Sequence, residues 1–320
     1  MHPAYSVIIF TSSSGAGYGL LVWLALARLT GAWDMSPAVA VAACLLALAL
    51  ITVGLLSSTF HLGHPERAWR AMTQWRSSWL SREGVVAVLT YPAALLFTAG
   101  WFWSPVAGSI MSAAAAATIV LSLVTVYCTS MIYASLKTIP RWSNGFVPPI
   151  YLLFALASGG LLFTGFRAIA GSAGMSEMIL ISTVLLAAWV VKMYYWRYND
   201  TAKPESDSGT ATGLGYLGKV TQLEAPHTSE NYLLKEMGYQ VARKHAARLR
   251  KIALVTGLII PAVILLLAGN LEGPLQYLLL LLAVVSGFAG IVNERWLFFA
   301  EARHVVTLYY GRLSLIHISE

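Results

Sequence analysis

Charged residues are scarce in this chain. Asp, Glu, Lys and Arg make up 11% of its 320 residues, whereas hydrophobic residues make up 58%. Because a soluble domain has about 25% charged residues, this composition excludes an ordinary soluble fold and indicates an integral membrane protein. The 21 basic residues outnumber the 14 acidic ones, but they form no array interleaved with base-stacking aromatics. We therefore expect no nucleic-acid partner and relate the basic surplus to membrane orientation.

Cysteine is equally scarce. The two cysteines, Cys44 and Cys128, each lie inside an apolar run. A disulfide framework needs paired, exposed thiols, and an iron–sulfur cluster usually takes four cysteine ligands. This chain is therefore expected to carry no cluster, and any iron–sulfur cluster must belong to a partner chain.

Histidines are missing from the middle of every apolar run. His61 and His304 stand at the ends of runs, and the other five lie in loops or tails. A membrane cytochrome b places paired axial histidines inside its spans. We therefore predict that the chain binds no haem.

Eight apolar runs are long enough to cross the hydrocarbon core, which takes roughly 20 residues as a helix. The predicted fold class is all-α, a polytopic membrane protein with eight transmembrane helices in one membrane domain, residues 1–312. The first run is too long for a cleaved signal peptide and should be retained. Its small residues, 12–19, predict close helix packing instead of a phosphate loop. The expected spans are residues 5–29, 37–60, 84–103, 108–134, 146–170, 175–197, 252–270 and 275–299.

The basic residues predict the orientation. Nineteen of them, Lys192 and Arg295 included, are counted at or between span ends on one face, and only Arg28 and Arg167 fall on the other. The positive-inside rule then places both termini and the basic loops in the cytoplasm. The tail at residues 313–320 continues no earlier pattern; we interpret it as an artefact of cloning or sequencing and exclude it.

One sizeable loop, residues 199–250, lies on the same face. Its first half is rich in Gly, Ser and Thr and should be irregular. Its second half, residues 229–251, has an apolar stripe and a basic end, which predict an amphipathic helix. Such a helix suits anionic lipid and a docking face equally well.

The chemistry of the chain is expected between spans 2 and 3. Residues 57–84 hold two histidines, four arginines, two glutamates and three tryptophans. A neutral imidazole at His61 could hydrogen-bond a quinone carbonyl and exchange a proton near neutral pH, and Arg67 could hold the other carbonyl or a semiquinone's charge. Glu83, at the start of span 3, could pass protons to water. The residues alone equally suit a helix cap at His61, a helix-dipole contact at Glu83 and arginines that only set topology.

The last span ends in a second polar group. Glu294 and Glu301 are seven residues apart and share a helix face, which would suit a proton path. Arg295 and Arg303 are close enough in sequence to neutralise them, and we favour that structural interpretation.

The motif HLGHPERAW, followed by SWLSREG, resembles the DmsC/YnfH family of membrane anchor subunits of molybdopterin oxidoreductases such as DMSO reductase. The YASLKTIPRW segment at residues 133–142 and the count of eight spans fit the same family. The resemblance implies a quinone site formed by His61, Leu62, Gly63, Arg67 and Glu83, with His61 and Glu83 in proton transfer. It also implies an iron–sulfur subunit and a molybdopterin catalytic subunit as partners on the cytoplasmic face.

Within the family, the loop segments at residues 209–220 and 231–245 resemble the anchor of the quinone-linked sulfite dehydrogenase. We therefore expect a subunit that passes electrons from sulfite oxidation to ubiquinone or menaquinone. The anchor of a DMSO reductase that oxidises menaquinol is the alternative. A transporter or structural membrane protein without a redox role is a third; it would need a polar site near the bilayer midplane, and the sequence shows no clear one.

Overall fold

The computed structural model describes residues 3–60, 64–102, 108–171, 173–202, 206–221, 223–224 and 241–308. Within these residues there is no strand, and eight helices are long and apolar enough to cross a membrane. The predicted all-α fold with eight transmembrane helices is confirmed. The spans are α1 (Tyr5–Thr30), α2 (Pro37–Thr59), α3 (Trp79–Ala99), α4 (Gly108–Ala134), α5 (Val147–Ile169), α6 (Met175–Thr201), α9 (Val241–Leu254) continued by η3 (Val255–Ile259) and α10 (Ile260–Ala268), and α11 (Pro274–Ala300).

Local sequence sets several helix ends. Helix α2 begins with Ser36 as N-cap and Pro37 at the first helical position. A proline there loses no hydrogen bond, because the N–H at this position has no partner within the helix. Gly31 ends α1 with a φ of 63°, a conformation that suits glycine best. The Ser78 hydroxyl accepts a hydrogen bond from the Ser81 N–H, so α3 begins at Trp79, five residues earlier than predicted. Three helices thus extend well beyond the apolar runs, since α6 also continues to Thr201 and α9 begins at Val241 instead of residue 252.

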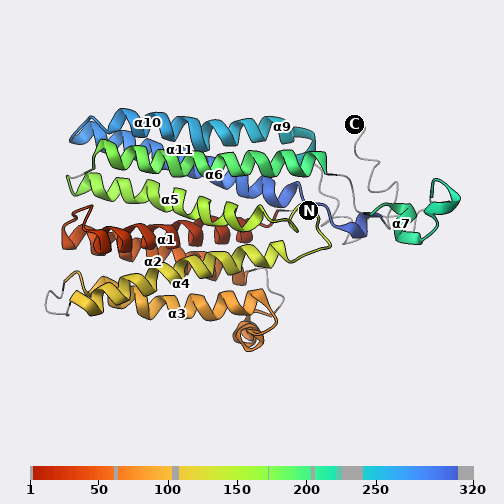
Figure 1. Cartoon of the computed structure of the whole chain (residues 1–320), viewed down its shortest axis with the longest axis horizontal. Helices are drawn as coiled ribbons and strands as arrows, with labels where there is room; N and C mark the ends of the chain where they lie inside the picture. The colour runs from red at the N-terminus through yellow and green to blue at the C-terminus, as the bar shows by residue number, and fades with distance from the viewer. Residues whose placement is uncertain are drawn as a thin grey trace.

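The spans run side by side, and one end of the bundle carries most of the connecting structure (Figure 1). We call this end the basic face. It holds the start of α1, the loop at residues 135–146, and the short elements η1 (Pro65–Gln74), α7 (Ser208–Thr212), η2 (Gly215–Leu217) and η4 (Val305–Leu308).

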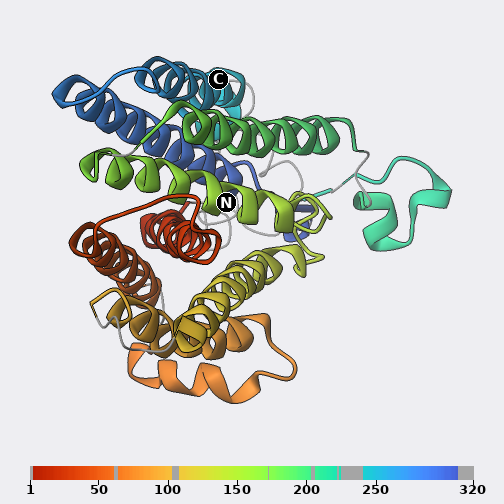
Figure 2. The ribbon, with the colours of Figure 1, turned by 60° about the vertical axis from the view of Figure 1, so that its left-hand side comes forward.

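Helix α1 lies at the centre of the bundle. It is the most buried of the eight spans and packs against α2, α4, α5 and α11. Figure 2 shows α3 and η1 at one edge, with α6, α9, α10 and α11 on the other side of α5. The bundle thus has two halves, one formed by α1 to α4 and the other by α5 to α11. They meet where α1 and α4 pack against α5.

Small residues permit the closest helix contacts, as the sequence predicted for residues 12–19. A Cβ on Gly19 or Gly159 would collide with the facing backbone of α5 or α1, and Gly257 and Gly290 meet in the same way between η3 and α11. Helices in lipid associate through such packing because apolar burial provides no driving force there. At η3 the helix widens into a π turn, and the Trp189 indole donates a 2.9 Å hydrogen bond to the Gly257 carbonyl oxygen.

The long loop is more ordered than predicted. In its first half, Asp207 caps α7 through a reciprocal capping box with Thr210. Hydrogen bonds from the Thr210 backbone and side chain hold the pKa of Asp207 below its usual value. In its second half, α9 begins at Val241. Residues 229–240 of the predicted amphipathic helix, and the tail at 313–320, lie outside the described residues.

The contact between α1 and α5 can be tested with Gly159→Ala. The new methyl group would meet the backbone of Gly19 and Leu20, and such overpacking typically costs about 1–3 kcal/mol. Gly165→Ala on the same helix is the control, because nothing lies within 4 Å of a Cβ there. Thermal unfolding of the purified protein in detergent should show a lower midpoint for Gly159→Ala alone. Equal midpoints in the two variants would mean that α1 and α5 do not require this close approach.

Candidate functional site

Three of the five predicted quinone-site residues, His61, Leu62 and Gly63, lie outside the described residues. Their flanks are described: α2 ends at Thr59, Phe60 follows it, and His64 precedes η1. The exposed Phe60 and the first turn of η1 thus bracket the motif at the basic face.

Arg67 lies on η1 with an exposed side chain. Its Nε lies 3.7 Å from a carboxylate oxygen of Glu66, and the same oxygen lies 3.0 Å from Nδ1 of His64. More than half of each of these three side chains is exposed, so such contacts are worth little. The guanidinium can therefore turn to another anionic or carbonyl partner at small cost.

Glu83 lies in a different environment from the one predicted. Since α3 begins at Trp79, Glu83 is on its second turn with only 4% of its surface exposed. The Thr129 hydroxyl of α4 donates a hydrogen bond to its Oε1. The expectation that Glu83 meets water at the loop is therefore wrong for this conformation: the side chain points into the bundle, between α3 and α4.

Short contacts hold η1 against the beginning of α3. The Gln74 N–H donates a 3.1 Å hydrogen bond to the Ser81 hydroxyl, and Arg82 donates to the carbonyl oxygens of Trp75 and Arg76. The Arg82 guanidinium also lies 4.2 Å from the centre of the Trp79 ring. These contacts attach the segment carrying Arg67 to the helix carrying Glu83.

Glu83 differs from the other buried glutamates of the described chain. Glu177 is paired with Arg167, Glu294 with Lys192 and Arg295, and Glu301 with Arg141 and Arg250. No described basic side chain forms an ion pair with Glu83. Burying an uncompensated carboxylate is costly, so Glu83 is the buried acid that is best placed to gain a proton or a ligand partner.

The structure reveals a buried charged triad that sequence reasoning missed, formed by Lys192, Glu294 and Arg295. The Lys192 Nζ and the Arg295 Nε each lie 2.5 Å from a different oxygen of Glu294, and none of the three side chains is more than 3% exposed. Lys192 is nine residues before the end of α6, about 14 Å along the helix axis. The prediction that the basic residues counted for the topology lie at or between span ends was therefore wrong for Lys192 and Arg295, which are both buried inside spans.

Aromatic rings surround the two cations of this triad. The Lys192 Nζ lies 4.0 Å from the centre of the Tyr195 ring, and the Arg295 guanidinium lies 4.3 Å from that of Tyr151. Such contacts are strongest where water is excluded. Tyr195 and Trp196, three and four residues after Lys192, were the one sequence signal that this lysine faces a packed interior.

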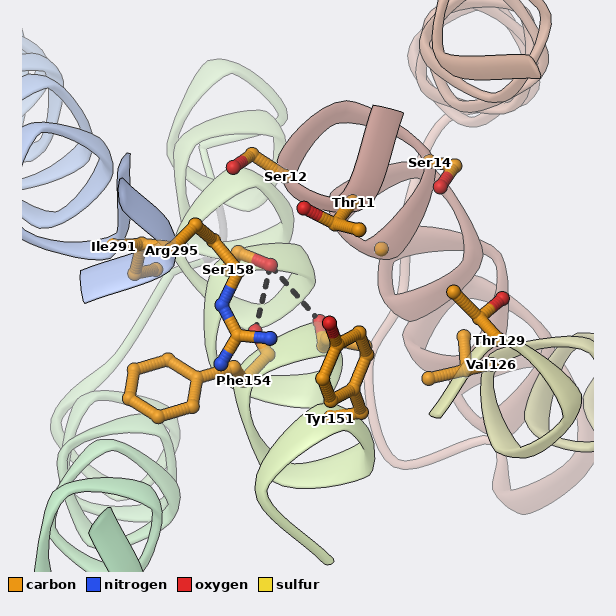
Figure 3. A pocket seen from close by; sticks show the side chains of 12 residues that line it. Thr11, Ser12, Ser14, Val126, Thr129, Tyr151, Phe154, Ser158, Ile291 and Arg295 are labelled. Atoms are coloured by element: carbon orange, nitrogen blue, oxygen red, sulfur yellow. Dashed lines mark hydrogen bonds between the residues drawn. The ribbon is translucent and has the colours of Figure 1, made fainter. Parts of the chain in front are cut away.

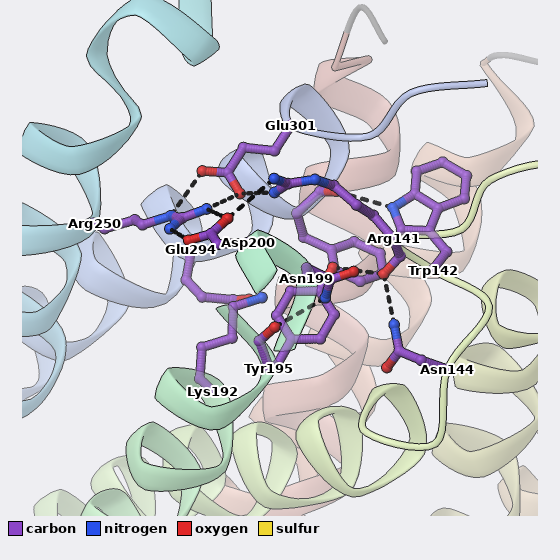
Figure 4. A network of polar contacts seen from close by, with 11 residues as sticks. Arg141, Trp142, Asn144, Lys192, Tyr195, Asn199, Asp200, Arg250, Glu294 and Glu301 are labelled. Atoms are coloured by element: carbon purple, nitrogen blue, oxygen red, sulfur yellow. Dashed lines mark hydrogen bonds and ion pairs between the residues drawn. The ribbon is translucent and has the colours of Figure 1, made fainter. Parts of the chain in front are cut away.

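A second ion network joins four segments at the basic face (Figure 4). Arg141 and Arg250 both bind Glu301, each at 2.8 Å, and both also bind Asp200. The predicted partner of Glu301, Arg303, was therefore wrong. Arg141 and Glu301 are 160 residues apart, and only the fold brings them together. Glu294 does pair with Arg295, as predicted.

The comparisons with known proteins agree with this architecture. The model of the DMSO reductase anchor subunit family (DmsC) matches residues 1–311. The chain belongs to this family. It is 34% identical to the C subunit of sulfite dehydrogenase from Allochromatium vinosum, over 98% of this chain and 100% of that protein. It is 26% identical to the C subunit of anaerobic dimethyl sulfoxide reductase from Escherichia coli, over 57% of this chain and 64% of that protein.

The charge balance of the triad in this anchor subunit predicts an asymmetric response to substitution. Glu294→Gln leaves two buried cations facing each other, and breaking a buried pair in this way costs about 3–5 kcal/mol. Lys192→Met leaves the neutral Glu294–Arg295 pair and fills the space with a flexible apolar side chain. Thermal unfolding in detergent should therefore show a much larger loss for Glu294→Gln. A loss of similar size for Lys192→Met would show that net charge does not decide the stability of the triad.

Proposed function

We propose that this anchor subunit binds a quinone headgroup at the basic face, between residues 60–67 and Glu83. The observation that carries the proposal is the burial of Glu83, without an ion pair to any described basic side chain, on the helix that hydrogen bonds attach to η1, which carries part of the family motif. His61, Leu62, Gly63 and Arg67 form the other side of the site. The bound quinone supplies two-electron, two-proton redox chemistry.

The surroundings suit an amphiphilic ligand. Leu56 and Phe60 at the end of α2 and Leu80 at the start of α3 are at least half exposed, so an isoprenoid tail can lie against them in lipid. Thr52 and Tyr91 share a 2.7 Å hydrogen bond that joins α2 to α3 deeper in the membrane. A headgroup entering near Phe60 can therefore reach the loop while its tail stays in the bilayer.

Each residue of the site has a distinct part. His61 hydrogen-bonds one carbonyl oxygen and exchanges a proton there. Arg67, held by weak exposed contacts, turns to the other carbonyl oxygen. Glu83 exchanges the second proton from the bundle interior, where Thr129 orients its carboxyl group. Leu62 and Gly63 are assigned to the site by the family motif alone.

We infer that the electrons come from sulfite oxidation. The full-length match to a sulfite dehydrogenase subunit supports this assignment, and the partial match to a DMSO reductase subunit supports the alternative of menaquinol oxidation. A molybdopterin subunit would oxidise sulfite, and an iron–sulfur subunit would carry the electrons to this chain. The basic face would then be cytoplasmic, in a bacterial inner membrane.

The iron–sulfur subunit has a suitable docking surface at the basic face. A hollow of about 850 Å³ lies among the α4–α5 loop, the end of α6 and η4. Lys137, Arg141, Asp200 and His304 line it, so it presents charge of both signs to a polar partner. The ion network below it keeps these segments together.

The quinone site can be tested in the intact complex with His61→Ala and Glu83→Gln. Because general acid–base groups contribute about 10²–10⁴ in rate, quinone-coupled kcat should fall by at least tenfold, with a smaller change in quinone KM. Electron transfer to an artificial dye should stay near the wild-type rate, because dyes react directly with the soluble subunits. Wild-type quinone turnover in both variants would refute the assignment and leave His61 as a helix cap.

The orientation can be tested with single cysteines on opposite faces. Tyr216, on η2, is 82% exposed, and Ala32, in the α1–α2 turn, is also exposed. The native Cys44 and Cys128 are buried and should not react with the thiol reagent. In intact cells a membrane-impermeant thiol reagent should label Ala32→Cys and reach Tyr216→Cys only after lysis. The reverse pattern would place the soluble partners outside the cytoplasm and favour an exported reductase.

A further inference from the structure

A small polar cavity lies inside the bundle between α1, α4, α5 and α11. It offers about 20 Å³ to the centre of a water molecule and is lined by Ser12, Thr129, Tyr151 and Arg295, among others. Figure 3 shows the Arg295 guanidinium beside the Tyr151 ring, with Thr129 on the other side of that ring. The cavity thus separates the Glu83 side of the bundle from the triad side.

Three buried polar groups that line this cavity make no hydrogen bond of normal geometry among the described residues: the Ser12 hydroxyl, the Tyr151 hydroxyl and the Nη2 of Arg295. The Tyr151 and Arg295 side chains lie close to each other, so a single ligand can reach both. The three residues are 8%, 4% and 2% exposed, so bulk water does not satisfy these groups. Leaving three buried groups unsatisfied at one place is costly. Their convergence indicates a ligand that both donates and accepts hydrogen bonds.

Water is the ligand that fits. A buried water needs roughly 10–15 Å³ and two to four polar partners, and the cavity provides both. It is too small for a quinone headgroup. The Arg295 cation and the two hydroxyls would orient the water, which could then reach the Thr129 side of the cavity.

Each end of the cavity leads to a group that can hold a proton. On one side Thr129 hydrogen-bonds Glu83. On the other, Arg295 binds Glu294, which binds Lys192. Together these residues hold two cations and two carboxyl groups, so an ionised Glu83 makes the polar layer neutral overall.

We propose that water in this cavity connects Glu83 with the Lys192–Glu294–Arg295 triad and lets Glu83 exchange its proton with Lys192 across the bundle. The inference rests on the proposed quinone chemistry of Glu83. When Glu83 gives its proton to a reduced quinone oxygen, the Lys192 ammonium gives one proton to the Glu294 carboxylate that it contacts, and Lys192 becomes a neutral amine. The Glu294 carboxyl group passes a proton to the cavity water, and a proton from this water reaches the Glu83 carboxylate on the Thr129 side. Oxidation of a quinol runs the same transfer in reverse. Tyr151 and Ser12 position the water, and Arg295 is a positioning residue that stays charged throughout.

The test combines a structure with kinetics of the intact complex. A cryo-EM map in lipid nanodiscs, at a resolution that shows ordered water, should contain water within hydrogen-bond distance of Tyr151 and Arg295. Tyr151→Phe keeps the ring and removes one water ligand, so quinone-coupled kcat should fall by about tenfold with quinone KM unchanged. Lys192→Met should lower kcat to a similar extent.

Tyr195→Phe is the matched control. Tyr195 is also buried, but its hydroxyl donates to the Arg141 carbonyl oxygen, and it does not line the cavity. The quinone-coupled kcat of the Tyr195→Phe complex should stay within twofold of the wild-type value. If Tyr151→Phe lowers the thermal midpoint of the complex, Ser12→Ala provides the same comparison with a smaller change.

A dry cavity in the map would overturn the proposal. Water in the cavity together with wild-type kcat in Tyr151→Phe and Ser12→Ala would also overturn it, leaving a purely structural water. A normal kcat in Lys192→Met would exclude Lys192 as the exchange partner and overturn the proposal as stated. If Glu83→Gln is impaired while these variants are normal, only this inference fails; if Glu83→Gln is itself normal, the proposed function of Glu83 fails.

Discussion

Charged side chains inside the bundle have to find partners there, because lipid provides none. This constraint organises the half of the molecule beyond α5. Ion pairs join α5 to α6 near one membrane surface, α6 to α11 in the interior, and the α4–α5 loop, α6, α9 and α11 at the basic face. Arg167 and Glu177 are only ten residues apart, but the pairs in the interior and at the basic face connect segments distant in sequence, so these pairs also select which helices become neighbours. The apolar surfaces alone would distinguish these neighbours poorly.

The half formed by α1 to α4 follows another rule. Its interior contacts are made by small residues and by hydroxyl groups such as those of Thr52, Thr90 and Thr125, which bond mainly to their own helix. Glu83 is the buried charged residue of α1 to α4, and a hydroxyl group is its partner. A permanent cation beside it would hold it ionised. Without one, its charge can change with the state of a neighbouring ligand, which a proton-exchanging group requires.

The fold class, the number of spans and the family could be predicted from the sequence, because they depend on long apolar runs and on a contiguous motif. The sequence was not sufficient for interior polar contacts. Lys192 was counted at the end of a span because the predicted span ended at residue 197 whereas α6 continues to Thr201, and Glu83 was expected to be solvated because the Ser78 cap was not recognised. The partners of Glu301 are far away in sequence. Contacts between distant segments depend on helix rotation and tilt, which hydropathy does not encode.

The proposed function places two conflicting demands on one rigid bundle. The surface that meets soluble partners must keep its shape, whereas a lipid-soluble ligand must enter and leave. The structure separates them: the four-residue ion network stiffens the basic face at α6, α9 and α11, while α3 and η1 lie at the opposite edge, attached by hydrogen bonds and facing lipid. The polar layer from Glu83 to Lys192 crosses between these regions on the basic-face side of the membrane. In the proposed proton exchange, a change of charge at the lipid-facing edge would reach the rigid half through α1 and α5, without movement of the helices at the basic face.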